Sequence, residues 1–471
     1  MKAVALLLGP AGVGLIGLYN SVIELSKTVS GLGLGNSGVR EIASAIGQND
    51  DELIGQLQLA IRRLAICLGI VGACVLALLS PLISSVVFGH PGKALAVSLL
   101  GLMLVLHGIN VAQTATIQGY RRVGDLARLS ILGAISSTII AVVLYAVLGE
   151  SGIVPALILM AGVTVAVAWY FARKLWVQPV SSDWSTSRRH WKRLSTLGAA
   201  VAWGALLGAL VPFFARSLIV RELGVEANGI YMAAWAISGL FAQFIIQAMS
   251  ADFFPGLSAA SHDGKEMNRL VNEQIEIGIL IALPGILVTS VFASLVIRGL
   301  YTGEFISAAT LLQWFLLGVF GRVISWPMGM LVLAKGHSKT FAVLQSISVP
   351  IHLALILLCF HFFGIEGAAM AFALQNIIYV PALLVFLNCK YTLTWAREVG
   401  KLLFVSLTFL CLIQGSRFAW GESIAFYAAS SLILLVGVFY SLRELVLRVG
   451  EHPKIKKMLG RLPKSLLRIL A

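Results

Sequence analysis

The sequence predicts an all-α polytopic membrane protein, in which two related helical bundles are followed by two further helices. Three observations indicate this: the composition, a succession of apolar stretches, and a repeat along the chain. Of the 471 residues, 58% are hydrophobic and only 12% are charged, and the mean hydropathy is +0.91. A soluble domain is close to half apolar and a quarter charged, so the composition excludes one large soluble core.

Apolar stretches long enough to cross a bilayer recur along the whole chain. A transmembrane helix needs about 20 predominantly apolar residues. Thirteen stretches meet this requirement, and mostly short connections separate them. We expect spans at about 13–35, 63–88, 94–118, 125–148, 152–172, 195–220, 228–251, 273–297, 305–333, 340–363, 366–388, 400–416 and 423–442.

The distribution of lysine and arginine orients these spans. The net charge is +14, and in a membrane protein such an excess gathers in cytoplasmic loops, so nucleic acid is a poor candidate partner. Alternate connections and the tail from Arg443 hold 27 of the 35 basic residues, and the other side holds 6. The C-terminus is therefore predicted to be cytoplasmic. The residues 454–471 are typical of an amphipathic segment on the anionic inner leaflet, or of a solubilising tail.

The repeat is the strongest sign of internal organisation. The segment Leu8–Gly14 returns 215 positions later as Leu223–Gly229, and the register holds to about residue 170 without a net gap. Each unit begins and ends on the same predicted side, so the repeats are parallel. The predicted domains are an N-terminal bundle of five spans (1–172), a basic cytoplasmic linker (173–194), a bundle of six spans (195–388), two extra spans (389–442) and a basic cytoplasmic tail (443–471).

The repeat also predicts that one span is missing at the start. The second unit opens with the span 195–220, whose counterpart at this offset would precede Met1. A start codon placed too far downstream and a real loss of one helix both explain the deficit, and the genomic sequence upstream distinguishes them. On either account Leu8–Gly14 is expected to be an external hinge between two helices.

Charged side chains inside a predicted span are the first candidates for a binding site, because a charge is costly in hydrocarbon. Asn20, Glu24 and Lys27 have the spacing i, i+4, i+7, which places them on one helix face. In the functional interpretation this face lines a water-filled cavity. Lys27 then attracts an anionic substrate, and Glu24 holds it or takes up a cation. In the alternative, Glu24 and Lys27 neutralise each other and only fix helix packing.

Four further polar residues lie within predicted spans. Arg322 is too deep in the span 305–333 to reach the surface easily, and its counterpart in the first repeat is His107. Polar residues at matching depths in both repeats favour a central cavity. Arg216 either contributes to this cavity or extends to the external surface. Gln243 and His107 either line it or make hydrogen bonds between helices.

Motifs of several enzyme classes are absent from the sequence. It has no Walker A loop, no HExxH, no GxSxG and no metal-spaced cluster, and the external connections are too short for a catalytic domain. The five cysteines lie in or beside apolar stretches without CxxC spacing, so we expect them to pack as small apolar side chains. These observations predict a protein that is not an enzyme and that holds no cofactor or metal.

The opening residues resemble a known family. The run from Lys2 to Leu15 resembles the LGPxGxG entry motif of Wzx-type polysaccharide flippases, which belong to the multidrug/oligosaccharidyl-lipid/polysaccharide exporter superfamily. The glycines from Gly31 to Gly35, the polar connection Ala43–Leu53 and the repeat extend the resemblance over most of the chain. The resemblance is therefore not confined to one short motif.

This resemblance implies a flippase for undecaprenyl-pyrophosphate-linked oligosaccharide in the bacterial inner membrane, working from the cytoplasmic to the periplasmic leaflet. It implies alternating access between two bundles, often coupled to an ion gradient such as Na⁺ or H⁺. It also implies membrane lipids and other polysaccharide assembly proteins as partners. Lys27, Arg216 and Arg322 match by position the cationic cavity that holds the diphosphate in this family.

Physical chemistry favours the same function over its rivals. A lipid-linked sugar diphosphate is doubly negative and cannot cross about 30 Å of hydrocarbon unaided. Lys27, Arg216 and Arg322 outnumber Glu24, which favours an anionic substrate over the cationic drug of a multidrug and toxin extruder. A membrane glycosyltransferase or polymerase would need a large external loop with carboxylates. A non-transporting component of polysaccharide assembly is the remaining alternative.

Overall fold

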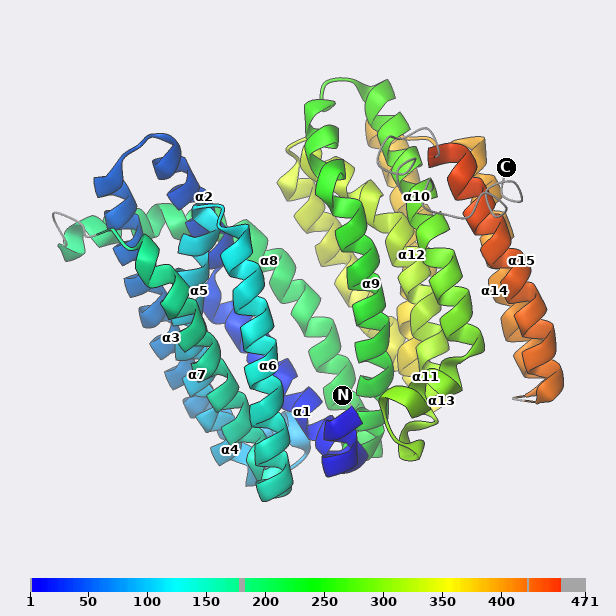
Figure 1. Ribbon diagram of the computed structural model, residues 1–471, viewed down its shortest axis with the longest axis horizontal. Coiled ribbons are helices and arrows are strands. Elements are labelled where there is room, and N and C mark those ends of the chain that lie inside the picture. The colour runs from blue at the N-terminus through cyan, green and yellow to red at the C-terminus, as the bar shows by residue number, and fades with distance from the viewer. Residues whose placement is uncertain (1, 178–182, 422, 450–471) are drawn as a thin grey trace. The chain divides into compact units, whose positions relative to one another are not determined.

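The computed structural model describes residues 2–177, 183–421 and 423–449 (Figure 1). Within these ranges the chain forms α-helices joined by short turns, with no strand. Helices satisfy all their backbone hydrogen bonds internally, which a segment in hydrocarbon requires. The predicted all-α polytopic membrane fold is thus confirmed. The predicted amphipathic tail 454–471 lies outside the described residues.

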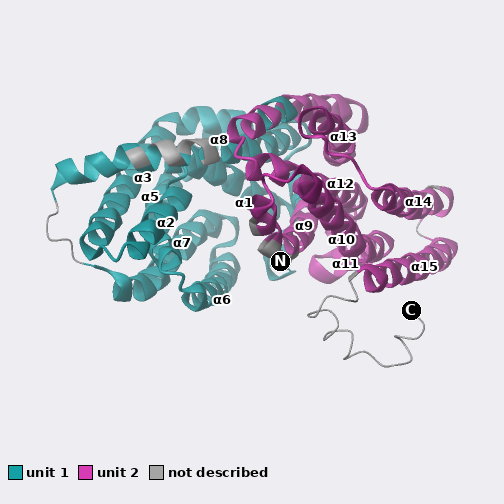
Figure 2. Cartoon of the chain, turned by 90° about the horizontal axis from the view of Figure 1, so that it is seen from above, with its two compact units in different colours: residues 1–232, 345–349 teal, residues 233–344, 350–471 magenta. Residues whose placement is uncertain are grey.

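Two compact units make up the chain, coloured teal and magenta in Figure 2: residues 1–232 with 345–349, and residues 233–344 with 350–471. The helices that begin in unit 1 are α1 (Lys2–Gly31), α2 (Leu34–Gly47), α3 (Asp51–Phe88), α4 (Ala94–Leu99), α5 (Gly101–Gly119), α6 (Val123–Leu148), α7 (Ile153–Ala172), α8 (Trp184–Leu223) and α9 (Val225–Ala259). The later helices are α10 (Gly264–Val291), α11 (Ala293–Leu300), α12 (Ala308–Ala334), α13 (Ser338–Tyr391), α14 (Arg397–Trp420) and α15 (Ile424–Val449).

These contact-based units differ from the domains predicted from the repeat. The division falls within α9, after Met232, and a few residues of α13 belong to unit 1. The predicted domain limits were drawn from the sequence repeat and not from contacts, so this division does not test them and they stay a prediction. Helix α8 begins at Trp184, inside the region 173–194 that was expected to be a linker.

Among the described residues, eleven helical segments are long and apolar enough to cross a membrane. Two of them, Val123–Leu175 and Ser338–Tyr391, are 53 and 54 residues long, which is more than twice the length that one crossing requires. Each contains a glycine with positive φ, Gly149 or Gly364. Each long segment therefore covers two of the predicted spans. The total number of crossings stays a prediction.

The backbone repeats at the predicted offset of 215. Gly9 and Gly224 have φ angles of 61° and 87°, and Gly149 and Gly364 both have 58°. Glycine adopts this left-handed region without a steric penalty, which explains why it occupies these four positions. Gly9 breaks α1, and Gly224 separates α8 from α9. The predicted hinge within Leu8–Gly14 is therefore confirmed as a break between helical segments, and its external location stays a prediction.

The turns after Gly149 and Gly364 repeat in their packing as well. A Cβ on Gly152 would lie 2.6 Å from the carbonyl oxygen of Leu144, and one on Gly367 would lie 2.0 Å from that of Cys359. Each contact joins residues eight positions apart, which a continuous helix would hold about 12 Å apart. The chain therefore reverses direction in the same way in both repeats.

Aspartates cap the beginnings of several helices. The Asp50 carboxylate accepts a hydrogen bond from the Leu53 backbone N–H and caps α3, and Asp263 caps α10. Asp183 caps α8, and hydrogen bonds from the Ser185 hydroxyl and the Trp184 backbone N–H lower the pKa of its carboxyl. These caps fix where the three helices start.

Unit 1 packs around α3 and α5, whose backbones meet at glycines. A Cβ on Gly108 would lie 2.4 Å from the carbonyl oxygen of Ala65, and one on Gly69 would lie 2.9 Å from the Cα of Val105. Small residues allow this approach, and dispersion and close packing then stabilise the helix pair in lipid.

In unit 2, α14 and α15 pack on α10, which confirms the two additional C-terminal helices.

The start of α9 meets α1 within unit 1 at a glycine pair. A Cβ on Gly14 would lie 2.1 Å from the carbonyl oxygen of Val225, and one on Gly229 would lie 1.9 Å from that of Pro10. The two contacts are equivalent, because each glycine and each oxygen has its partner 215 positions along the chain. Asn228 adds a hydrogen bond from Nδ2 to the Gly14 carbonyl oxygen at 2.8 Å. We call this contact the glycine crossing.

Substituting either glycine of the crossing should destabilise the protein. We expect Gly14→Ala and Gly229→Ala each to cost about 1–3 kcal/mol, because the new methyl group overlaps backbone that cannot move aside. Thermal unfolding of the purified chain, followed by tryptophan fluorescence, measures this. Gly208→Ala on α8 is the matched control, since its new methyl group would contact nothing within 4 Å. Equal melting temperatures for all three variants would contradict the close contact.

Candidate functional site

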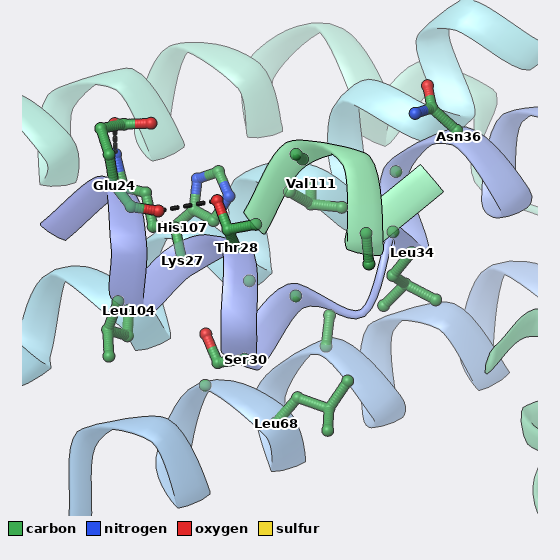
Figure 3. A pocket seen from close by; sticks show the side chains of 18 residues that line it. Glu24, Lys27, Thr28, Ser30, Leu34, Asn36, Leu68, Leu104, His107 and Val111 are labelled. Atoms are coloured by element: carbon green, nitrogen blue, oxygen red, sulfur yellow. Dashed lines mark hydrogen bonds and ion pairs between the residues drawn. The ribbon is translucent and has the colours of Figure 1, made fainter. Parts of the chain in front are cut away.

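A cavity of about 300 Å³ lies in unit 1, and α1, α2, α3, α5 and α8 contribute to its wall (Figure 3). We call it the Lys27 cavity. Its remaining lining is glycine, alanine, leucine and valine. The polar or charged side chains that line it are Glu24, Lys27, Thr28, Ser30, Asn36 and His107. The cavity is thus a mainly apolar space with a few polar groups, which is the usual form of a ligand site.

Glycine leaves the room that this cavity occupies. Gly31, Gly33 and Gly35 line it from the end of α1 and the start of α2. Gly33 has a φ of 66°, and a Cβ there would lie 2.2 Å from the carbonyl oxygen of Gly198 on α8. A larger residue at this position would strain the backbone and separate α8 from α1. The glycine-rich end of α1 therefore shapes the site.

Glu24 and Lys27 form an ion pair at the cavity. The Lys27 Nζ atom donates to Glu24 Oε1 at 3.1 Å. The Lys27 side chain is 22% exposed and that of Glu24 is 66% exposed, so the ammonium group is the more enclosed of the two. An ion pair this open to solvent contributes little to stability. An ammonium group has three donors, and this pair uses one of them.

A second cavity of about 260 Å³ shares two residues with the first. Lys27 and His107 line both cavities, and Asn20, Asn110 and Thr164 line the second one. The Oδ1 atom of Asn110 is buried and has no hydrogen-bond partner among the described residues. Lys27 and His107 therefore stand where the two spaces meet.

Four of the seven predicted site residues are brought together by this arrangement. Asn20, Glu24 and Lys27 share one face of α1, as their spacing predicts, and His107 on α5 joins them at the two cavities. The ion pair that the alternative interpretation required is also present. Binding of a substrate by these residues stays a prediction.

Arg216 lies elsewhere in unit 1. Its side chain is 8% exposed, so it does not extend to a surface, and it is not among the residues that line either cavity. Its guanidinium group donates to the Ser21 hydroxyl at 2.5 Å and to the Gly17 carbonyl oxygen at 3.4 Å. Arg216 therefore ties α8 to α1, and its predicted contact with substrate stays a prediction.

Arg322 and Gln243 belong to unit 2. Arg322 is exposed on α12, although its neighbours Gly321 and Val323 are buried. It lies twelve residues before the end of α12, as His107 does in α5. Their equal depth in the membrane stays a prediction. Gln243 is exposed on α9. A common cavity for these two residues and Lys27 stays a prediction.

Several residues of the Lys27 cavity were not predicted from the sequence. Thr28 is one helical turn after Glu24 and donates its hydroxyl to the Glu24 carbonyl oxygen at 2.8 Å. Ser30 and Asn36 lie beyond it on α1 and α2. The one signal that would have found Thr28 is the repeat, because its counterpart 215 positions later is Gln243.

Removing the Ser21 hydroxyl tests the role of Arg216. Ser21→Ala should cost about 1–3 kcal/mol, because it leaves a buried guanidinium group with one hydrogen-bond partner fewer. The melting temperature of the purified chain measures the loss. Ser26→Ala is the control, since Ser26 lies on the same helix and its hydroxyl makes no hydrogen bond to a described residue. A Ser21→Ala variant as stable as this control would exclude a structural role for the contact.

Comparison with known proteins assigns the chain to a family. The family described as polysaccharide biosynthesis protein matches residues 3–310, which is more than half of the chain. The lipid III flippase of Escherichia coli (strain K12) is 25% identical over 412 residues, which cover 84% of this chain and 94% of that protein. The match therefore extends over nearly the whole of a transporter.

Solved structures show the same fold. A multidrug resistance transporter of the MATE family and MOP superfamily, in its inward-facing conformation, superimposes with a TM-score of 0.71 at 16% identity, covering 81% of this chain and 91% of that one. The lipid II flippase MurJ, in an inward closed conformation, gives a TM-score of 0.66 at 14% identity, covering 93% and 97%. These matches confirm the resemblance to flippases of the superfamily, and the relatives are transporters and not enzymes. The chain is therefore a membrane transporter that belongs to the polysaccharide biosynthesis protein family.

Proposed function

We propose that this protein is a flippase that moves undecaprenyl-pyrophosphate-linked oligosaccharide from the cytoplasmic to the periplasmic leaflet of the bacterial inner membrane. The enclosed ammonium group of Lys27 is the observation that carries the proposal. It is a cation inside a cavity of a polysaccharide-family transporter, and among the described residues it pairs with a more exposed carboxylate. The match to a lipid III flippase supports the same class of substrate.

The groups around Lys27 suit a sugar diphosphate. Two donors of the Lys27 ammonium group are free to bind phosphate oxygens. The hydroxyls of Thr28 and Ser30 and the amide of Asn36 line the same space and offer hydrogen bonds to sugar hydroxyls. Arg322, exposed on α12 of the second unit, supplies a further cation for the diphosphate. Arg216, Asn20, His107 and Gln243 complete the proposed set.

Transport then proceeds by alternating access between the two repeats. Two bundles of the same fold provide the two equivalent halves that such a movement needs. The energy comes from an ion gradient, with Na⁺ or H⁺ as the coupling ion. Glu24 is the carboxylate that takes up the coupling cation, because it pairs with Lys27 and is open to solvent. Binding of the cation at Glu24 would release Lys27 for the diphosphate.

A multidrug extruder of the same superfamily is the second candidate. The similarity in fold to a multidrug transporter, with a TM-score of 0.71, favours the extruder. The charge in the cavity favours the flippase, because the enclosed group is the cation and the exposed one is the carboxylate. A cavity that binds cationic drugs would place its carboxylate in the enclosed position.

The orientation completes the proposal. The excess of lysine and arginine in alternate connections and in the tail places the C-terminus in the cytoplasm. The partners are the lipid-linked oligosaccharide, the membrane lipids and other proteins of polysaccharide assembly. A basic tail at the cytoplasmic surface is well placed to bind anionic lipids there.

Replacing the cavity cations should abolish export. We expect Lys27→Ala and Arg322→Ala each to remove the surface polysaccharide from a strain that depends on this protein, because the diphosphate loses a cationic partner. The polysaccharide is measured on gels of whole-cell extracts, and the protein in the membrane fraction is measured by immunoblot. Lys27→Arg should restore export, because it keeps the charge.

Lys401→Ala is the control for these variants, because it removes an exposed lysine outside both cavities. It should leave the amount of surface polysaccharide unchanged. Normal polysaccharide in both Lys27→Ala and Arg322→Ala cells, with the proteins present in the membrane, would contradict the proposed cationic site.

Reporter fusions test the orientation. Green fluorescent protein joined after Ala471 should fluoresce, and alkaline phosphatase at the same position should be inactive, because the first reporter folds in the cytoplasm and the second in the periplasm. Fusions after Gly149, in the turn that follows α6, should give the opposite result. An active phosphatase at Ala471 would reverse the proposed orientation.

A further inference from the structure

A third pocket in unit 1, of about 280 Å³, shares no residue with the two cavities described above. We call it the arginine pocket. It lies between α3, α5, α7 and the turn after α7. Its polar and aromatic lining includes Arg62, Gln113, Thr116, Trp169, Arg173 and Trp176.

Gln58 holds one wall of this pocket in place. Its side chain is 1% exposed. Its Nε2 atom donates to the Leu175 carbonyl oxygen at 2.9 Å, and its Oε1 atom accepts from the Val177 backbone N–H at 3.0 Å. These two hydrogen bonds fasten the turn after α7 to α3. Arg173 and Trp176 belong to this turn. Their positions are therefore fixed by hydrogen bonds that join Gln58 to residues 117 and 119 positions later in the sequence.

Both arginines of the pocket lie over aromatic rings. The Cζ atom of Arg62 is 5.7 Å from the ring centre of Trp176. That of Arg173 is 5.0 Å from the ring centre of Trp169 and 4.7 Å from that of Tyr170. A guanidinium group stacked in this way keeps its in-plane N–H donors available for a phosphate.

Among the described residues, no carboxylate neutralises these two arginines. Neither Arg62 nor Arg173 takes part in an ion pair within the part of the chain that the structure describes. By contrast, Arg122, which precedes α6, and Arg128 in α6 share the carboxylate of Asp125. The arginine pocket therefore keeps two positive charges for a ligand.

An unpaired acceptor adds a second requirement. The Oε1 atom of Gln113 is buried and has no hydrogen-bond partner among the described residues. A buried acceptor without a donor is costly. The atom belongs to a residue that lines the pocket, so a ligand hydroxyl would satisfy it. The ligand thus carries both an anionic group and a hydroxyl group.

The predicted span limits indicate that the pocket lies at the level of lipid headgroups. Arg62 immediately precedes the predicted span 63–88, and Arg173 immediately follows α7. Trp169 and Trp176 are 55% and 38% exposed, as is typical of aromatic residues at a membrane interface. Basic pockets between membrane helices on the cytoplasmic side are suited to anionic lipid headgroups.

We propose that the arginine pocket binds the headgroup of an anionic phospholipid of the inner leaflet, of the phosphatidylglycerol type. The phosphate binds Arg62 and Arg173, and a glycerol hydroxyl donates to Gln113 Oε1. Ile109, Ala112 and Ala172 face the start of the acyl chains. The site is separate from the proposed transport cavity, so its occupant is a resident lipid and not the transported substrate.

Lipid binding to the purified full chain tests this site. The protein in detergent is titrated with equal amounts of phosphatidylglycerol and phosphatidylcholine of the same acyl chains, and native mass spectrometry counts the bound lipids. We expect the wild type to favour phosphatidylglycerol. In the double variant Arg62→Gln/Arg173→Gln, the ratio of bound phosphatidylglycerol to bound phosphatidylcholine should fall about tenfold. Arg121→Gln/Arg128→Gln removes the same charge from the neighbouring turn and the start of α6, and this variant should keep the preference.

Two further arms make the result specific. Glycerol 3-phosphate at the lipid's concentration should not displace phosphatidylglycerol, because it lacks acyl chains. Gln113→Ala should remove the preference for phosphatidylglycerol over phosphatidic acid, which has no glycerol in its headgroup. The single variant Arg62→Gln, at an exposed position, serves if the double variant does not fold. Wild-type preference in the arginine variants, or displacement by glycerol 3-phosphate, would overturn the proposal.

Discussion

The glycine crossing between α1 and the start of α9 is the contact on which the rest of unit 1 depends. Gly14 and Gly229 let two backbones approach so closely that a Cβ on either would overlap a carbonyl oxygen. This contact fixes the direction in which α1 leaves its break at Gly9. The same helix carries Lys27 to the cavity, and Arg216 ties it to α8 one to two turns after the crossing. In lipid, where apolar burial does not drive helix association, small residues of this kind decide how helices meet.

Much of the fold follows from sequence patterns that have a direct physical cause. Apolar length predicts the spans, and the 215-residue repeat predicts matched breaks such as those at Gly9 and Gly224. Helical spacing predicts that Asn20 and Lys27 share a face. The repeat places His107 at the depth of Arg322, but it gives no contacts between helices distant in sequence. Long-range contacts therefore could not be predicted.

Arg216 shows why the site was only partly predictable. Its position in an apolar span indicated a cavity or a surface, yet the side chain is buried against α1, where the Ser21 hydroxyl accepts its hydrogen bond. A partner 195 residues away leaves no local pattern. The arginine pocket was missed for the same reason, because Gln58 fixes it through a distant turn. In both cases the basic residue was visible in the sequence and its partner was not.

The central claim is that this transporter moves a lipid-linked oligosaccharide to the outer leaflet, and depletion of the protein tests it most directly. In depleted cells, the lipid-linked oligosaccharide is extracted and its share in each leaflet is measured with a membrane-impermeant reagent that modifies the sugar. The account predicts that the lipid accumulates and is protected from the reagent, and that wild-type protein restores its exposure. An accumulated lipid that the reagent reaches as fully in depleted cells as in wild-type cells would contradict it.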